Sequence, residues 1–165
     1  MDYEQAKTFW TRKQADAVPC PDARGALEEF LAAHRVCALA TGADDYVRCT
    51  PLEYTWLDGA FWIFTEGGMK FAGLQSNSNV SVAVFDASPE FGGLHSAQIQ
   101  GTASVVEPFS ADYLRLLEFK HIGEDAIRAL PEPLYLLQIV PTEADFLNSD
   151  FKGQGFDSRQ HVMFR

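Results

Sequence analysis

The sequence predicts a mainly β fold of the α+β class, built as a small antiparallel barrel with flanking helices. Seven or eight short runs rich in β-branched and aromatic residues follow one another from residue 36 to the C-terminus, each bounded by Gly, Asp, Asn or Pro. The first five runs lie too close together for crossover helices, so antiparallel pairing dominates. Many short strands with few helices are typical of a closed or partly closed barrel.

A helix precedes the strands. Pro21-Asp22 opens a helical pattern whose apolar residues fall on one face: Ala23, Ala26, Leu27, Phe30 and Leu31. We expect this helix to cover the sheet. Because the chain has no internal repeat and no long linker, we expect residues 1–165 to form a single domain, with residues 1–33 as a helical N-terminal arm.

The strand pattern then runs almost to the C-terminus. We expect the first five strands at residues 36–41, 46–57, 60–65, 80–85 and 96–106. Ser110 is the expected N-cap of a second helix that ends near Phe119. Further strands are expected at residues 135–140, 144–148 and 160–164.

The clearest local signal is Asp58-Gly59, which separates two strand patterns as the residue pair of a type I′ hairpin turn. If Leu57 faces Ala60, counting back along both strands places Leu52 opposite Thr65. The same count brings Arg48 and Lys70 to one end of the hairpin.

Composition and charge exclude some classes of function. The 165 residues are 47% hydrophobic, which is ample for a packed core, and the formal net charge is -10. Such a field repels nucleic acid and anionic lipid, so we expect no nucleic-acid partner and no membrane association. The N-terminus lacks the pattern of a signal peptide, and a cytoplasmic protein is expected. Cys20, Cys37 and Cys49 form no CxxC pair and are interpreted as small core residues.

The positions of the basic residues are more informative than their sum. Between residues 36 and 114 the only Lys or Arg residues are Arg48 and Lys70, in a stretch otherwise rich in Asp and Glu. Two converging cations repel each other unless an anion lies between them, and a phosphate fits that requirement. The segment 70–75 is helix-like, and its first N–H groups could add donors. The alternative is that Arg48 pairs with Glu53 or Glu66 and that Lys70 is simply solvated.

The run from residue 48 to residue 84 has a recognisable order of features. A strand-borne Arg is followed by a hairpin turn, an aromatic-Thr pair, a Lys five residues later, then Leu, Asn and alternating Val: Arg48, Asp58-Gly59, Phe64-Thr65, Lys70, Leu74, Asn77, Val80, Val82 and Val84. A strand with a central Gly follows at residues 98–103. This pattern resembles the FMN-binding split-barrel family, also called pyridoxamine 5'-phosphate oxidase-like, and in particular its general-stress-type flavoprotein branch.

The resemblance implies a six-stranded antiparallel split barrel and a homodimer that holds FMN at the subunit interface. Arg48 and Lys70 would bind the FMN phosphate, and groups around Cys49 and Thr50 would meet the edge of the flavin ring. The remaining cofactor contacts that the resemblance implies are Phe64 and Thr65 at the ribityl and phosphate region, Met69, and Gln98, which would replace the family's flavin-contacting Gln because Ser96 stands at that position.

The sequence departs from true pyridoxamine 5'-phosphate oxidases at its C-terminus. Arg159 and His161 are spaced suggestively, but the rest of the basic segment that holds substrate phosphate is missing. We therefore expect an FMN-dependent oxidoreductase or flavin reductase acting on an unidentified small molecule, and not that oxidase. No catalytic side chain can be named, because the flavin carries the chemistry.

Two alternatives stay open. A deazaflavin could replace FMN, or the protein could be a non-catalytic flavin- or haem-binding protein that stores, carries or senses its cofactor. In the haem case, His95 or His161 would be the axial ligand. The four histidines have no HxH or HxxxH spacing, so no dedicated metal site is expected.

Overall fold

The computed structural model describes residues 2–87 and 92–164. Its helices are α1 (Tyr3–Ala15), α2 (Ala23–Ala33), α3 (Lys70–Leu74), α4 (Ala111–Phe119), α5 (Glu124–Arg128) and the 3-10 helix η1 (Ser149–Gln154). Its strands are β1 (Val36–Ala43), β2 (Tyr46–Glu53), β3 (Thr55–Leu57), β4 (Ala60–Thr65), β5 (Asn79–Phe85), β6 (His95–Val106), β7 (Tyr135–Asn148) and β8 (Arg159–Met163). The mainly β, antiparallel fold class predicted from the sequence is confirmed.

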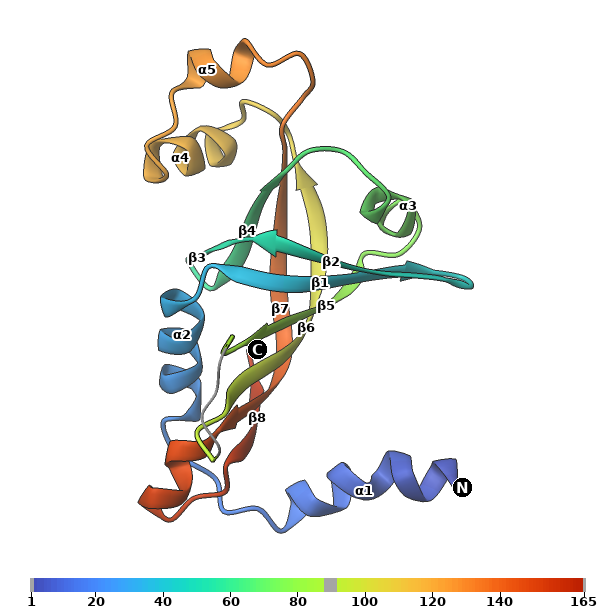
Figure 1. Cartoon of the computed structure of the whole chain (residues 1–165), viewed down its shortest axis with the longest axis vertical. Coiled ribbons are helices and arrows are strands. Elements are labelled where there is room, and N and C mark those ends of the chain that lie inside the picture. Colours follow the sequence, from blue (N-terminus) through green and yellow to red (C-terminus); the bar gives the residue numbers. More distant parts are fainter. Residues whose placement is uncertain (1, 88–91, 165) are drawn as a thin grey trace.

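All strands belong to one sheet whose pairing order is β2-β1-β5-β6-β7-β4-β3, and β8 pairs with the C-terminal part of β7, residues 143–147. The strands at the two ends of this order, β2 and β3, are separated in the chain only by Tyr54. The sheet therefore curls until its two edges approach each other. In Figure 1, β6 and β7 run along the long axis of the molecule and β1 and β2 cross them.

The expected six strands are corrected to eight. Tyr46–Leu57 was expected as one strand but is broken at Tyr54, whose backbone N–H donates to Arg35 O at 2.8 Å and whose side chain is buried. The first part pairs with β1 and the last part with β4, because the chain turns the corner between the two edges of the sheet. β8 adds a further strand to the end of β7.

The hairpin register is confirmed near the turn and is wrong farther away. Asp58 and Gly59 both have positive φ, 53° and 72°, as a type I′ turn requires, and Leu57 pairs with Ala60. Leu52, however, pairs with Cys37 on β1, and Thr65 pairs with Tyr135 on β7. Because the chain bends at Tyr54, β2 pairs with β1 and not with β4.

β7 is one continuous strand, although two were expected. Its pairing with β6 shifts register between Gln100 and Gly101, which face Glu143 and Pro141. The extra residue, Thr142, forms a bulge. A bulge accommodates a proline that cannot donate to the ladder, so the strand continues through Pro141 instead of ending there.

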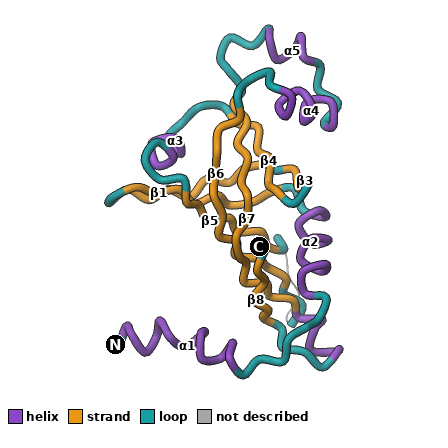
Figure 2. The backbone as a smooth tube through the Cα atoms, turned by 180° about the vertical axis from the view of Figure 1, so that it is seen from behind, coloured by secondary structure: helices purple, strands orange, loops and turns teal. Residues whose placement is uncertain are grey.

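Two apolar clusters hold the elements in place. The larger one fills the barrel and includes Leu27 and Leu31 of α2, both fully buried, which confirms that α2 covers the sheet. The smaller cluster lies between β4, β7 and α4, around Trp62 and Tyr113. α4 and α5 lie at one end of the molecule, and α1 projects from the other (Figures 1 and 2). Of the helical arm expected at residues 1–33, therefore, only α1 projects from the rest of the molecule, because α2 packs in the core.

Candidate functional site

The turn that follows β4 holds a buried lysine. Lys70 is the first residue of α3 and is only 5% exposed. Its ammonium donates to the main-chain oxygens of Glu66, at 3.0 Å, and Gly67, at 2.8 Å. A lysine ammonium has three N–H groups, so one remains for a ligand. The alternative that Lys70 is simply solvated is therefore wrong.

α3 lies directly on the β1–β2 hairpin, and a glycine allows it to do so. A Cβ atom on Gly73 would come within 3.0 Å of Gly42 N and 3.2 Å of Thr41 Cβ. Any larger residue would push α3 away from β1. The close approach carries Lys70 to the end of the hairpin that holds Arg48.

Arg48 lies on β2 opposite Thr41 of β1. Burial lowers the pKa of Lys70, the nearby charge of Arg48 lowers this pKa further, and the charge of Glu66 opposes both effects. The two cations are thus within electrostatic reach of each other, as the sequence predicted, although α3 and not the β3–β4 hairpin brings them together. Among the described residues Arg48 has no ion pair, and Glu53 pairs instead with Lys120 at 2.7 Å.

Hydroxyl groups surround the same end of β2. The Oγ1 atoms of Thr41 and Thr50 are buried and have no hydrogen-bond partner within the described chain. Thr65 Oγ1 donates to Glu66 O at 3.0 Å. Buried hydroxyls without hydrogen-bond partners cost folding free energy. A bound anion that accepts hydrogen bonds from them would remove that cost. Two cations with unsatisfied hydroxyls fit a phosphate group.

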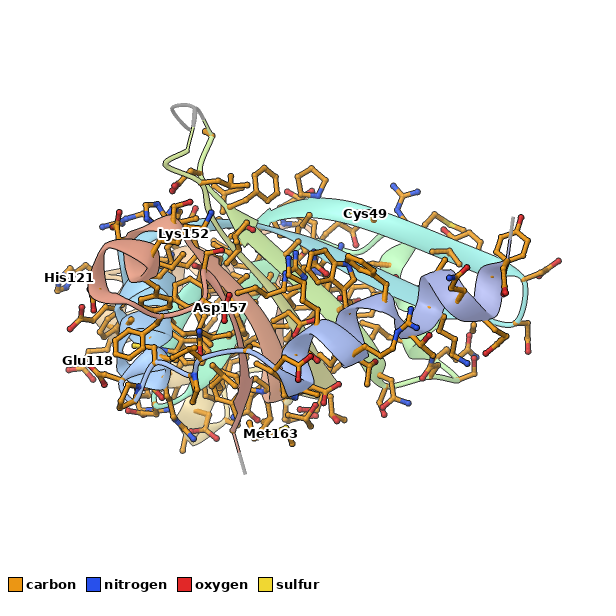
Figure 3. All side chains as sticks on the ribbon, turned by 90° about the horizontal axis from the view of Figure 1, so that it is seen from below. Cys49, Glu118, His121, Lys152, Asp157 and Met163 are labelled. Atoms are coloured by element: carbon orange, nitrogen blue, oxygen red, sulfur yellow. The ribbon has the colours of Figure 1, made fainter. Side chains whose placement is uncertain are left out.

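The other predicted contacts lie elsewhere. Phe64 points to the opposite side of β4 from Thr65, and its ring packs edge-on against Tyr113 of α4 at a centroid distance of 5.2 Å. Cys49, expected as a core residue, is exposed instead, because it alternates with Arg48 and Thr50 along β2; Figure 3 labels it near the rim of the molecule.

Two expected contacts are exposed side chains. Met69, directly before Lys70, is 55% exposed. Gln98 is exposed on β6, where it pairs with Ala83 and Asp145, and is not brought to the group around Arg48. Whether these side chains touch a cofactor stays a prediction.

A cleft that the sequence did not reveal opens at the other end of β2. It has a volume of about 550 Å³ and lies between the end of α2, the β2–β3 junction and the end of α4. Arg35, Lys120 and His121 line it, together with Glu53 and Trp56. Its basic residues lie far apart in the sequence, so no local pattern could have found it. Figure 3 labels His121 at the left edge of the molecule and Cys49 near its upper edge, well apart from each other.

Arg159 and His161 lie near α1 and do not join the group around Arg48. The Arg159 guanidinium stacks on the Trp10 ring at 4.3 Å, and His161 Nδ1 lies 3.1 Å from Asp145 Oδ1. The other histidine considered as a haem ligand, His95, has both ring nitrogens in contact with carboxylates. A haem iron would have to displace one of these contacts.

Comparisons with known proteins agree on the fold. The sequence matches the family model described as pyridoxamine 5'-phosphate oxidase over residues 23–148. No curated protein matches it. Similar solved structures include a FAD-binding protein from Mesorhizobium loti, with 23% identity, a TM-score of 0.59, and coverage of 74% of this chain and 90% of that one.

Two further structures carry different names. The haem storage protein HutZ from Vibrio cholerae has 17% identity and a TM-score of 0.58, with coverage of 71% of this chain and 88% of that one. General Stress Protein 26 from Bacillus anthracis has 18% identity and a TM-score of 0.56, with coverage of 84% and 98%. At these identities the structures establish a shared fold. Among the described residues, no helix has the length and apolar character that crossing a membrane requires.

Proposed function

The chain belongs to the pyridoxamine 5'-phosphate oxidase family, whose model it matches over residues 23–148, and on that premise we propose that it binds FMN and acts as an FMN-dependent oxidoreductase on a small molecule. The observation that carries the proposal is the group of Arg48, Lys70 and two unsatisfied threonine hydroxyls at the end of β2. FMN ends in a phosphate, which is the anion that such a group suits.

The chain's own residues would bind and orient the cofactor. Arg48 and the free N–H of Lys70 would neutralise the phosphate, and Thr41 and Thr50 would donate hydrogen bonds to it. The carbonyls of Glu66 and Gly67 hold the Lys70 ammonium before any ligand arrives, which reduces the entropy lost on binding. A bound flavin would supply the hydride or electron transfer.

We also propose that two chains form a homodimer with the flavin at their interface. In a single chain the outer side of β2 is open to solvent: Val47 is 79% exposed and Cys49 is exposed. Gln98 lies on β6, three strands away from Arg48 on β2 in the sheet order, so a flavin contact of Gln98 would be made with the cofactor bound to the partner. Light scattering after size exclusion measures the mass of the assembly, and a monomer at micromolar concentration would rule the dimer out.

The cleft at the other end of β2 is a suitable place for the small-molecule substrate. Arg35, Lys120 and His121 gather there in a chain whose net charge is -10. Because Lys120 is already paired with Glu53, the positive charge available to a ligand comes mainly from Arg35. The cleft therefore suits a small organic anion.

The first experiment is the absorption spectrum of the purified protein, followed by titration with FMN, FAD and haemin. Tight binding of FMN with flavin absorption bands supports the proposal. A Soret band with no flavin affinity would favour the alternative, a haem storage protein, as the neighbour HutZ is named. Oxidation of reduced nicotinamide cofactor by the FMN-loaded protein then separates an oxidoreductase from a flavin carrier.

The matched variants are R48A/K70A and the control R12A/K152A, which removes the same charge from exposed positions on α1 and η1. Hydrogen bonds to charged groups contribute about 1.5–3 kcal/mol each. Loss of both cations at the site should therefore weaken FMN binding by at least about 100-fold, since each 1.4 kcal/mol is tenfold. Wild-type affinity in R48A/K70A would refute the phosphate site.

A further inference from the structure

A chain of four ionisable side chains joins four elements at the base of the barrel. His34 follows α2, Asp86 follows β5, His95 begins β6 and Asp150 lies in η1. His34 Nε2 lies 3.1 Å from Asp86 Oδ1, and His95 Nδ1 lies 2.8 Å from Asp86 Oδ2. His95 Nε2 lies 3.3 Å from Asp150 Oδ2. None of these residues belongs to the flavin site.

The acceptors around the two rings determine how many protons the rings carry. His34 Nδ1 lies 2.8 Å from the carbonyl oxygen of Phe30, which can only accept, so Nδ1 must donate. Nε2 of the same ring faces a carboxylate oxygen of Asp86, which also accepts when ionised. His95 is likewise placed between two carboxylates. Each ring satisfies both of its contacts only as the doubly protonated imidazolium.

We infer that His34, Asp86, His95 and Asp150 form a proton-dependent clamp: protonated His95 bridges Asp86 and Asp150, Asp86 also contacts His34 at the end of α2, and the clamp loosens as His95 loses its proton. A neutral imidazole has one N–H, so the His95 ring then keeps one carboxylate contact and presents a lone pair to the other. The clamp closes as the pH falls through the neutral range and opens as it rises.

The charges within the clamp favour the closed form. Burial alone would raise the pKa of Asp86, but hydrogen bonds from His95 and His34 outweigh it and hold this pKa below its usual value. Burial alone would lower the pKa of His95, but the hydrogen bonds to Asp86 and Asp150 raise it. No other charged group in the described chain contributes to either shift. A histidine whose pKa is raised on folding adds stability below its unfolded pKa and loses it as the pH rises through the folded value.

The position of the clamp gives it a structural consequence. Phe30 packs at a tilt against the His34 ring, at a centroid distance of 4.1 Å, and against Phe146 of the core at 5.4 Å. His34 contacts a carbonyl in the last turn of α2, where a positive charge also interacts favourably with the helix dipole. His34 further lines the cleft beside Arg35. Opening of the clamp would therefore loosen the last turn of α2 and one wall of the cleft.

The direct test is the protonation state of the histidine rings in the intact protein, measured by ¹⁵N NMR of labelled imidazoles from pH 5 to pH 9. At pH 7 we expect His95 to give imidazolium shifts, because its contacts with Asp86 and Asp150 raise its pKa. A neutral His95 ring at pH 7 would overturn the inference. This measurement needs no variant and no flavin.

The second test is the pH dependence of urea unfolding. Above about pH 6.5, the unfolding equilibrium constant rises with pH if a histidine is protonated only in the folded state. Each such histidine contributes a rise of up to about tenfold per pH unit. H95Q should reduce this dependence by up to about tenfold, and H34Q is measured alongside it. The control H121N, chosen because Asn tolerates the positive φ of 56° at this position, should not. An identical pH dependence in all four proteins would refute the clamp.

Discussion

Replacing Gly101 with alanine should destabilise the protein because there is no room for a methyl group at this position. Gly101 lies in β6, next to the register shift where β7 bulges. A Cβ atom there would come within 2.8 Å of Val140 O, 3.1 Å of Ile139 Cγ2 and 3.2 Å of Pro141 Cα. Two of these atoms are backbone and the third belongs to a fully buried side chain. The clash can be relieved only if β6 and β7 move apart.

The magnitude follows from two opposing effects. Overpacking a well-packed interior costs about 1–3 kcal/mol. Alanine regains about 0.5–1 kcal/mol because it loses less backbone freedom than glycine on folding. The net loss of unfolding free energy for G101A therefore lies between about 0 and 2.5 kcal/mol and is centred near about 1 kcal/mol, which for a chain of this size lowers Tm by about 2–4 °C.

Urea unfolding monitored by tryptophan fluorescence measures this loss, with G153A as the control. A Cβ on Gly153, in η1, meets no described atom within 4 Å, so G153A should keep or raise its unfolding free energy, by up to about 1 kcal/mol. If G101A were as stable as G153A, the close approach of the two strands would not exist in solution and the reasoning would be refuted.

Three further outcomes are expected. Y54F removes a buried hydroxyl that donates at 2.7 Å to a carbonyl in the last turn of α2, so its unfolding free energy should fall by about 1–2 kcal/mol in the same assay. G73A should displace α3 from β1 and weaken FMN binding several-fold in a fluorescence titration, whereas G67A, which has open space around its Cβ, should bind as wild type does. Iodoacetamide at pH 8 should label exposed Cys49 in the native protein but not Cys37, whose pKa burial raises to about 12, as peptide mass spectrometry would show.

Each of these has a result that would contradict it. Equal stability of Y54F and wild type would mean that water replaces the lost donor at a position that is buried in the structure. Equal FMN affinity of G73A and G67A would mean that the position of α3 does not affect phosphate binding. Labelling of Cys37 at the rate of Cys49 would mean that β1 opens readily.

Local patterns were enough to predict most of the secondary structure. The alternation of apolar residues predicted the positions of the strands, and Asp58-Gly59 predicted the type I′ turn that the structure contains. These features depend on residues that are neighbours in the chain, so a local reading captures them. The two cations also stand out in the sequence, because Arg48 and Lys70 are isolated in an acidic stretch.

What lay beyond a local reading was the identity of each strand's partner. β2 follows the same alternation whether it pairs with β1 or with β4, and only the closure of the sheet, with its bend at Tyr54, decides between them. The same limit explains why the position of Phe64 was not predicted, because a phenylalanine suits a ligand pocket and a protein interior equally well. The packing of α4 over β4 directs its ring to Tyr113.

The sequence by itself therefore determined the strands, the turn and the pair of cations, since each follows from neighbouring residues and their charges. Only the tertiary structure decided that α3 carries Lys70 to Arg48, that basic residues from two helices meet in a cleft, and that His34 and His95 share Asp86. In each of these cases, side chains distant in the sequence are brought together by the curl of one sheet and by the helices packed against it, and neither leaves a local pattern.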